Sequence, residues 1–122
     1  MKREVLGPPS KLPFSQAIRC GDFIFLAGQI GFDTTTGKLV PGGIEAETKQ
    51  TLERMKSLLE AAGSSLEKVV KATVYLADLA DYAAMNEVYR QYFPAEPPTR
   101  ATVQVAGLVQ GARVEIEAIA LA

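Results

Sequence analysis

The sequence predicts an α+β domain in which one sheet carries two helices on one of its faces. Side chains alternate between apolar and polar over several short runs, which is typical of strands. Over residues 44–62 and 82–92, apolar positions instead recur every three or four residues, which indicates helices. A chain of 122 residues that is 48% hydrophobic is large enough for one core, so we expect a single domain over residues 1–122.

The first third of the chain predicts short strands separated by turns. The strand-like runs cover residues 2–6, 17–19 and 23–30. Glycine and proline make residues 7–13 irregular. Both faces of the third run are apolar, and Phe23 and Phe25 share one of them. A turn follows at residues 33–37, and Pro41-Gly42-Gly43 interrupts the chain before the first helix.

The middle of the chain predicts a helix, a strand and a second helix. These elements cover residues 44–62, 69–76 and 82–92. Gly63 is placed to end the first helix, because glycine is favoured just beyond a C-cap. Asp78 or Asp81 can cap the second helix, and Pro94 ends it.

The end of the chain predicts two strands joined as a hairpin. Alternation runs through residues 100–106 and 113–121, and Gly107 and Gly111 relax the connection between them. Such a hairpin would place Arg100 and Glu115 on one sheet face, a few residues apart, as a candidate site for a small anion. Periodicity alone favours the alternative, in which both are ordinary solvated charges.

Composition limits the chemistry that the chain can carry out. The sequence has no histidine, which excludes Ser-His-Asp and Cys-His systems and His-ligated metals within one chain. Cys20 is the only cysteine, so we expect a structural thiol and no disulfide, thiolate metal cage or metal site. With 13 basic and 14 acidic side chains and no basic run, the charge does not favour nucleic acid. No stretch is typical of a membrane span or a signal segment, which predicts a cytoplasmic protein.

The expected sheet has more apolar surface than two helices can cover. Phe23, Phe25, Tyr75 and Val103 fall on the faces that the helices do not reach. A bare apolar face of that size is unusual on a soluble monomer, so we expect a cyclic homo-oligomer that packs sheet surfaces together. The alternative is that residues 7–16 fold over this face.

Several stretches, in order and without large gaps, resemble the RidA/YjgF family. They are PFSQA at 13–17, AGQIG at 27–31, DLADY at 78–82 with Asn86 and Tyr89 beyond it, Thr99-Arg100, and VEIEAIA at 114–120. The resemblance covers nearly the whole chain. It implies a chorismate-mutase-like α+β fold with a mixed sheet, a homotrimer, and ligand clefts at the subunit interfaces.

The resemblance also implies an activity, the hydrolysis of reactive 2-enamino or 2-imino acids to 2-keto acids and ammonia without a cofactor. It assigns the substrate carboxylate to Arg100, and the water and proton transfers to Glu115. It places the backbone around Gly28 and the side chain of Asn86 in the same pocket or its support. The chemistry agrees, because a guanidinium binds a carboxylate through two parallel bonds and imine hydrolysis needs only oriented water and moved protons.

The sequence departs from the best-known family members at pocket positions. Phe14 stands where they have tyrosine, Ala27 where they have serine and Thr102 where they have cysteine, and Val109 replaces a proline. The lost hydroxyls leave open an alternative function, a non-catalytic regulatory protein that binds a small keto acid or similar metabolite. An RNA-cleaving role fits poorly with near-neutral charge and no histidine.

Overall fold

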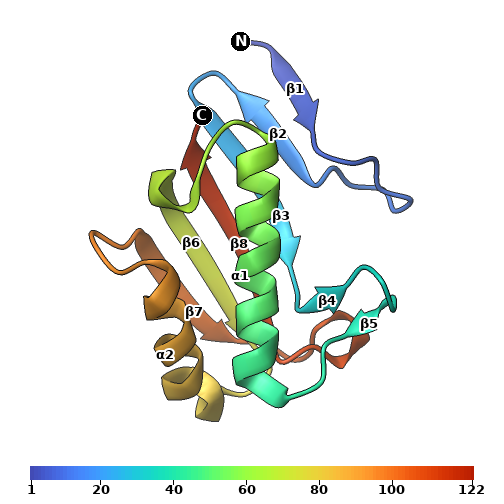
Figure 1. Cartoon of the computed structure of the whole chain (residues 1–122), viewed down its shortest axis with the longest axis vertical. Helices are drawn as coiled ribbons and strands as arrows, with labels where there is room; N and C mark the ends of the chain where they lie inside the picture. The colour runs from blue at the N-terminus through green and yellow to red at the C-terminus, as the bar shows by residue number, and fades with distance from the viewer.

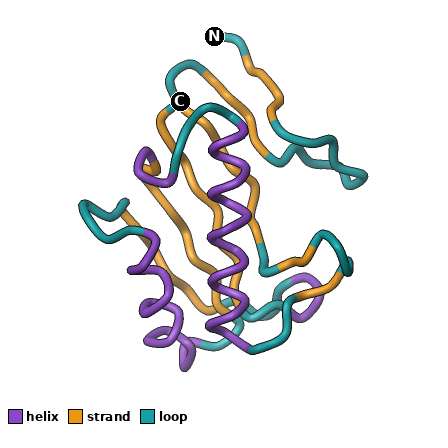
Figure 2. Tube along the Cα trace, in the orientation of Figure 1, coloured by secondary structure: helices purple, strands orange, loops and turns teal.

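The computed structural model describes residues 1–122 as a six-stranded sheet with two α-helices on one face (Figure 1). The elements are β1 (Arg3–Leu6), β2 (Ala17–Cys20), β3 (Phe23–Gln29), β4 (Phe32–Asp33), β5 (Lys38–Leu39), α1 (Gly43–Ala61), β6 (Val69–Leu76), α2 (Tyr82–Tyr92), β7 (Thr99–Gln104) and β8 (Val114–Leu121). Short 3-10 turns separate some of them, and β4 and β5 form a small ribbon of their own (Figure 2). The predicted α+β class is confirmed.

The order of strands in the main sheet is β1-β2-β3-β8-β6-β7. Only β6 and β7 are parallel, so the sheet is mixed. A parallel pair needs a crossover connection, and α2 supplies it between these two strands.

The predicted hairpin of the last two strands is wrong. β8 lies between β3 and β6, and β6 separates it from β7. Burial explains this order. Val114, Ile116 and Ala120 of β8 are completely buried, whereas no residue of β7 is, so the more apolar strand takes the central position and β7 the edge.

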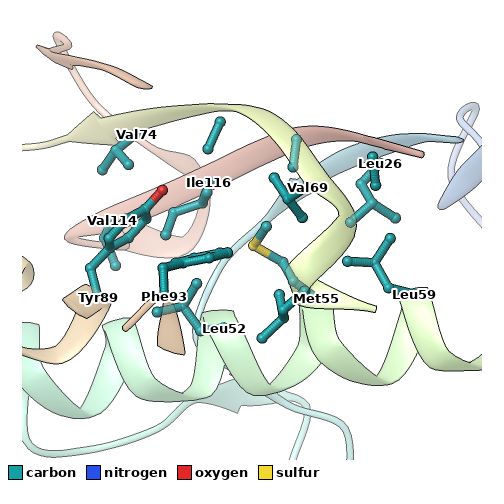
Figure 3. Close-up of a cluster of buried hydrophobic side chains, with 14 of the residues drawn as sticks. Leu26, Leu52, Met55, Leu59, Val69, Val74, Tyr89, Phe93, Val114 and Ile116 are labelled. Carbon is teal, nitrogen blue, oxygen red and sulfur yellow. The ribbon is translucent and has the colours of Figure 1, made fainter. Parts of the chain in front are cut away.

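The helix-covered face holds the core. Leu52, Met55 and Leu59 of α1 fill the space beneath β6 and β8, and Tyr89 and Phe93 extend the cluster at the α2 end (Figure 3). α1 begins after Gly42, whose φ is 117°, and ends before Gly63 at φ 82°, as predicted. Asp78 caps the 3-10 turn before α2 through a bond from Ala80 N–H, while Asp81 at the N-cap of α2 makes no capping bond.

The opposite face of the sheet is uncovered and carries several large apolar side chains. Phe23, Phe25, Val103 and Leu121 are each between 42% and 45% exposed there. The segment between β1 and β2 does not cover this face: in Figure 1 it projects beyond the sheet, and Gly7 lies against Leu58 of α1, on the helix side. None of the helices is both long and apolar enough to span a membrane.

Candidate functional site

Arg100 lies on the helix-covered face of the edge strand β7. It pairs across the strands with the buried Ala72, which fixes the face to which its side chain belongs. The guanidinium carbon is 4.8 Å from the ring centroid of Tyr89 and 5.6 Å from that of Tyr82, and Nη2 donates to the Tyr82 hydroxyl at 3.2 Å. No carboxylate of the chain pairs with Arg100. The cation therefore has aromatic support and unused donors.

Polar groups without partners gather around this arginine. Tyr89 Oη and Thr102 Oγ1 are buried and form no hydrogen bond. Asn86 bonds the Tyr82 hydroxyl, and together with the charge of Arg100 this lowers the pKa of Tyr82. A groove of about 580 Å³, lined by Asn86, Tyr89, Arg90 and Arg100 among others, opens beside them. We call Tyr82, Asn86, Tyr89, Arg100 and Thr102 the arginine cluster.

Glu115 lies on the opposite, uncovered face of the sheet. It pairs across the strands with Tyr75, whose hydroxyl donates to Glu117 Oε1 at 2.5 Å. Partial burial, and to a lesser degree the charge of Glu117, raise the pKa of Glu115. A carboxyl with a raised pKa is suited to exchanging protons near neutral pH. We call Gly28, Tyr75, Glu115 and Glu117 the glutamate cluster.

A β-bulge presses the backbone of Gly28 against Glu115. Leu26 pairs with Ala118 and Gln29 pairs with Ile116, so two residues of β3 oppose one residue of β8. A Cβ added at Gly28 would lie 2.5 Å from Glu115 Oε2, so any larger residue there would displace the Glu115 side chain.

The other two expected pocket residues lie near this bulge in the chain. Ala27 is its first residue, and the Ala27 N–H donates to the Gln16 carbonyl at 2.9 Å. Phe14 lies two residues before Gln16 and is 46% exposed. The bulge is therefore tied to the segment that carries Phe14.

The expectation that Arg100 and Glu115 share one sheet face is wrong. Thr102, Val74 and Ile116 form one row across β7, β6 and β8. Ile116 is in the core, so Thr102 and Arg100 are on the helix side, while Glu115, one residue from Ile116, must face away. One chain thus presents two separate clusters.

Residues 6–122 match the protein family described as Endoribonuclease L-PSP, whose solved members include proteins named YjgF and RidA. The chain belongs to this family.

Relatives in the family carry informative names. The 2-iminobutanoate/2-iminopropanoate deaminase of Capra hircus is 51% identical over 109 residues, which cover 89% of this chain and 80% of that protein. The crystal structure of RidA from an Antarctic Psychrobacter is 43% identical with a TM-score of 0.88, covering 94% of this chain and 93% of that one. The Escherichia coli TdcF structure with bound serine is 38% identical with a TM-score of 0.86, covering 98% and 94%.

Sequence reasoning missed the aromatic and acidic neighbours of the two central residues. The family motif contains Tyr82 and Tyr89, but no role was expected of either, although their spacing of two helical turns places both rings beside Arg100. Tyr75 was expected only on the uncovered face of the sheet and Glu117 only within the motif at 114–120, because their contact depends on the pairing of β6 with β8. No three His, Cys, Asp or Glu side chains gather closely enough to hold a metal ion.

Proposed function

We propose that this chain hydrolyses reactive 2-imino and 2-enamino acids to 2-keto acids and ammonia, without a cofactor. The observation that carries the proposal is Arg100, a cation held against two tyrosine rings with no carboxylate partner in the chain. Relatives about half identical to the chain are named for this reaction. A relative crystallised with serine, which has a carboxylate next to an amine-bearing carbon, adds support.

Arg100 would bind the substrate carboxylate and fix the position of the neighbouring carbon. Its planar guanidinium forms two parallel charge-assisted hydrogen bonds with a carboxylate, and the stacked rings of Tyr82 and Tyr89 limit its rotamers. An enamine takes a proton on carbon to become the imine. Water then adds to the C=N carbon, and the resulting carbinolamine loses ammonia to leave the C=O group. One water molecule is consumed, one ammonia molecule leaves as the C–N bond breaks, and the remaining changes are proton transfers.

Glu115 would take the proton from the attacking water and return it to the departing nitrogen. Its raised pKa keeps both protonation states accessible. The backbone of Gly28 forms one wall of its surroundings. Phe14, Ala27, Asn86 and Thr102 complete the proposed pocket.

The two clusters would meet across a subunit interface. They lie on opposite faces of one sheet, so they cannot hold one small substrate together within a protomer. Burying the uncovered apolar face against neighbouring copies would bring the glutamate cluster of one protomer to the arginine cluster of the next. We propose a homotrimer, a number that follows from the family resemblance.

The alternative is a protein that binds keto acids without turnover. Phe14 and Ala27 favour it, because they remove hydroxyls that other members offer to substrate or water. Ribonuclease activity, which the family description names, has less support, since basic and acidic side chains number 13 and 14 and histidine is absent.

One assay separates turnover from binding. 2-Aminoacrylate is generated enzymatically, and ammonia and pyruvate release are followed with and without the chain. We expect release to accelerate in proportion to the concentration of the chain, and Arg100→Ala to remove the acceleration. An unchanged rate together with calorimetric binding of pyruvate would favour the binding protein.

A further inference from the structure

A polar network crosses the core side of β3, between α1 and the bulge. Gln29 is only 2% exposed, yet its side chain is an amide. Its Nε2 donates to the Ala27 carbonyl at 3.1 Å and to Gln16 Oε1 at 3.0 Å, and its Oε1 accepts from Arg54 Nε at 3.2 Å. Both amide hydrogens and the carbonyl of the side chain are therefore used.

Arg54 decides which end of the Gln29 amide faces the bulge. A guanidinium only donates, so Gln29 must turn its oxygen to Arg54 and its nitrogen to Ala27. Arg54 is held in place by Phe32: Nη1 donates to the Phe32 carbonyl at 3.4 Å, and the guanidinium carbon lies 5.2 Å from the ring centroid. Without the arginine, Oε1 of the buried Gln29 would lose the hydrogen bond that it accepts, and the amide would no longer be held from the α1 side.

Ala27 links this network to the glutamate cluster. Its N–H donates to the Gln16 carbonyl, and its carbonyl accepts from Gln29, so both polar groups of its backbone are fixed from the helix side. The next residue is Gly28, whose backbone touches Glu115 on the other face. A displacement of the Ala27 peptide therefore moves the wall of the Glu115 pocket.

We infer that Arg54 is a positioning residue, which acts through Gln29 and the Ala27-Gly28 bulge to hold the backbone against the carboxylate of Glu115. Burial lowers the pKa of Arg54, and no carboxylate compensates the cation, which agrees with a group that stabilises a particular geometry. The inference rests on the proposed role of Glu115 in turnover.

Kinetics of four variants test the inference. Arg54→Met should lower kcat by roughly 10- to 100-fold, because small displacements at a reacting centre have effects of that size. The affinity for 2-ketobutyrate should stay within about twofold, since Arg100 is on the edge strand β7, which β8 and β6 separate from β3, and Arg54 contacts Gln29 and Phe32 instead. Arg54→Lys should recover most of kcat, because an ammonium also only donates.

Gln29→Glu can still accept from Arg54 but offers no N–H to Ala27, so it should behave like Arg54→Met. Lys49→Met, which removes an exposed cation from the same helix, should behave like the wild type.

A nuclear magnetic resonance titration of the Glu115 carboxyl gives a readout that does not need turnover. The titratable groups facing Glu115 are Glu117 on β8 and Tyr75 on β6, and β3 contributes only the Gly28 backbone. In Arg54→Met, water should enter at the bulge. The better solvation of Glu115 should lower its pKa, and the displaced backbone should shift the Gly28 amide resonance. Lys49→Met should change neither.

The outcomes are distinguishable. A wild type that releases no ammonia overturns the proposed function, and the titration then still decides whether Arg54 holds Gly28 against Glu115. An Arg54→Met variant with unchanged kcat and an unchanged Glu115 titration overturns the inference. Loss of kcat, keto-acid affinity and assembly together would make Arg54 a structural residue only, which also overturns it.

Discussion

Arg100 is set among groups that an ordinary strand arginine lacks. Tyr82 and Tyr89 stack on it, Asn86 lowers the pKa of Tyr82, and the buried Thr102 hydroxyl has no partner. Ordered polar groups that the chain itself leaves unpaired are typical of a site that a ligand completes. At the scale of single residues, the proposed function therefore depends on Arg100 and Glu115.

Arg100→Ala should abolish measurable binding of 2-ketobutyrate and deaminase activity. Removing one member of a desolvated charge pair costs roughly 2–5 kcal/mol. Arg100→Lys should recover little, because an ammonium cannot reproduce two parallel bonds. Calorimetric titration of 2-ketobutyrate into the wild type and both variants measures this. Equal affinities in wild type and Arg100→Ala would show that the carboxylate binds elsewhere.

Glu115→Gln should impair turnover more than binding. Glutamine keeps the shape of the side chain but cannot exchange a proton, so we expect a rate loss of roughly 10²–10⁴ with keto-acid affinity within a few-fold. Steady-state kinetics and calorimetry on the same preparation measure the two effects. Unchanged kinetics would place water activation on another group.

The raised pKa of Glu115 predicts how stability depends on pH. Partial burial and the charge of Glu117 disfavour the ionised form in the folded state. The stability that comes from the protonated form is present below the pKa of an unfolded glutamate and is lost as pH rises through the folded pKa. The melting temperature of Glu115→Gln minus that of the wild type should therefore increase as pH rises to 7. Thermal melts from pH 4 to 8 measure it, and a constant difference would argue against a raised pKa.

At the scale of elements, the bulge in β3 connects the two faces of the sheet. The extra residue turns Gln29 into the core and places Gly28 over Glu115. Because of this geometry, a substitution at Gly28 acts on Glu115 directly.

Gly28→Ala should lower kcat by about 10- to 100-fold while keto-acid affinity stays unchanged, because the new methyl group must displace the Glu115 carboxylate. Gly107→Ala is the matched control, since no atom lies within 4 Å of a Cβ added there. Kinetics of the two variants, with circular dichroism to check folding, test the prediction. Equal effects at both glycines would contradict it.

At the scale of the whole molecule, the uncovered apolar face and the separated clusters point to the same assembly. Large side chains such as Phe25 and Val103 are nearly half exposed on a face that no element covers. Light scattering should give about three times the chain mass of 13.1 kDa. A stable monomer at micromolar concentration would contradict the proposed assembly.

Mixed trimers test whether each cleft takes residues from two protomers. Arg100→Ala and Glu115→Gln chains, each inactive alone, should regain roughly a quarter of wild-type activity after random subunit exchange, because each mixed trimer contains one intact cleft. If both residues served the same cleft within one protomer, every mixture would stay inactive. Unmixed samples of each variant, refolded in the same way, are the controls.

The sequence by itself determined the elements and their polar and apolar faces. The strand over residues 69–76 has the predicted bounds, and the second helix begins after Asp81, one of the two expected caps, because periodicity and flanking turn residues are local properties. Motifs around Arg100 and Glu115 identified the family for the same reason. Residue type and spacing are enough to recognise strands, helices and family motifs.

Only the tertiary structure decided which strands are neighbours. Strand pairing depends on burial over long separations in sequence, so β8 lies between β3 and β6 and not beside β7. That order sets the face of every side chain, and it separates Arg100 from Glu115 because one step along a strand reverses the face. The contacts of Tyr82, Gln29 and Arg54 likewise exist only once distant segments pack together.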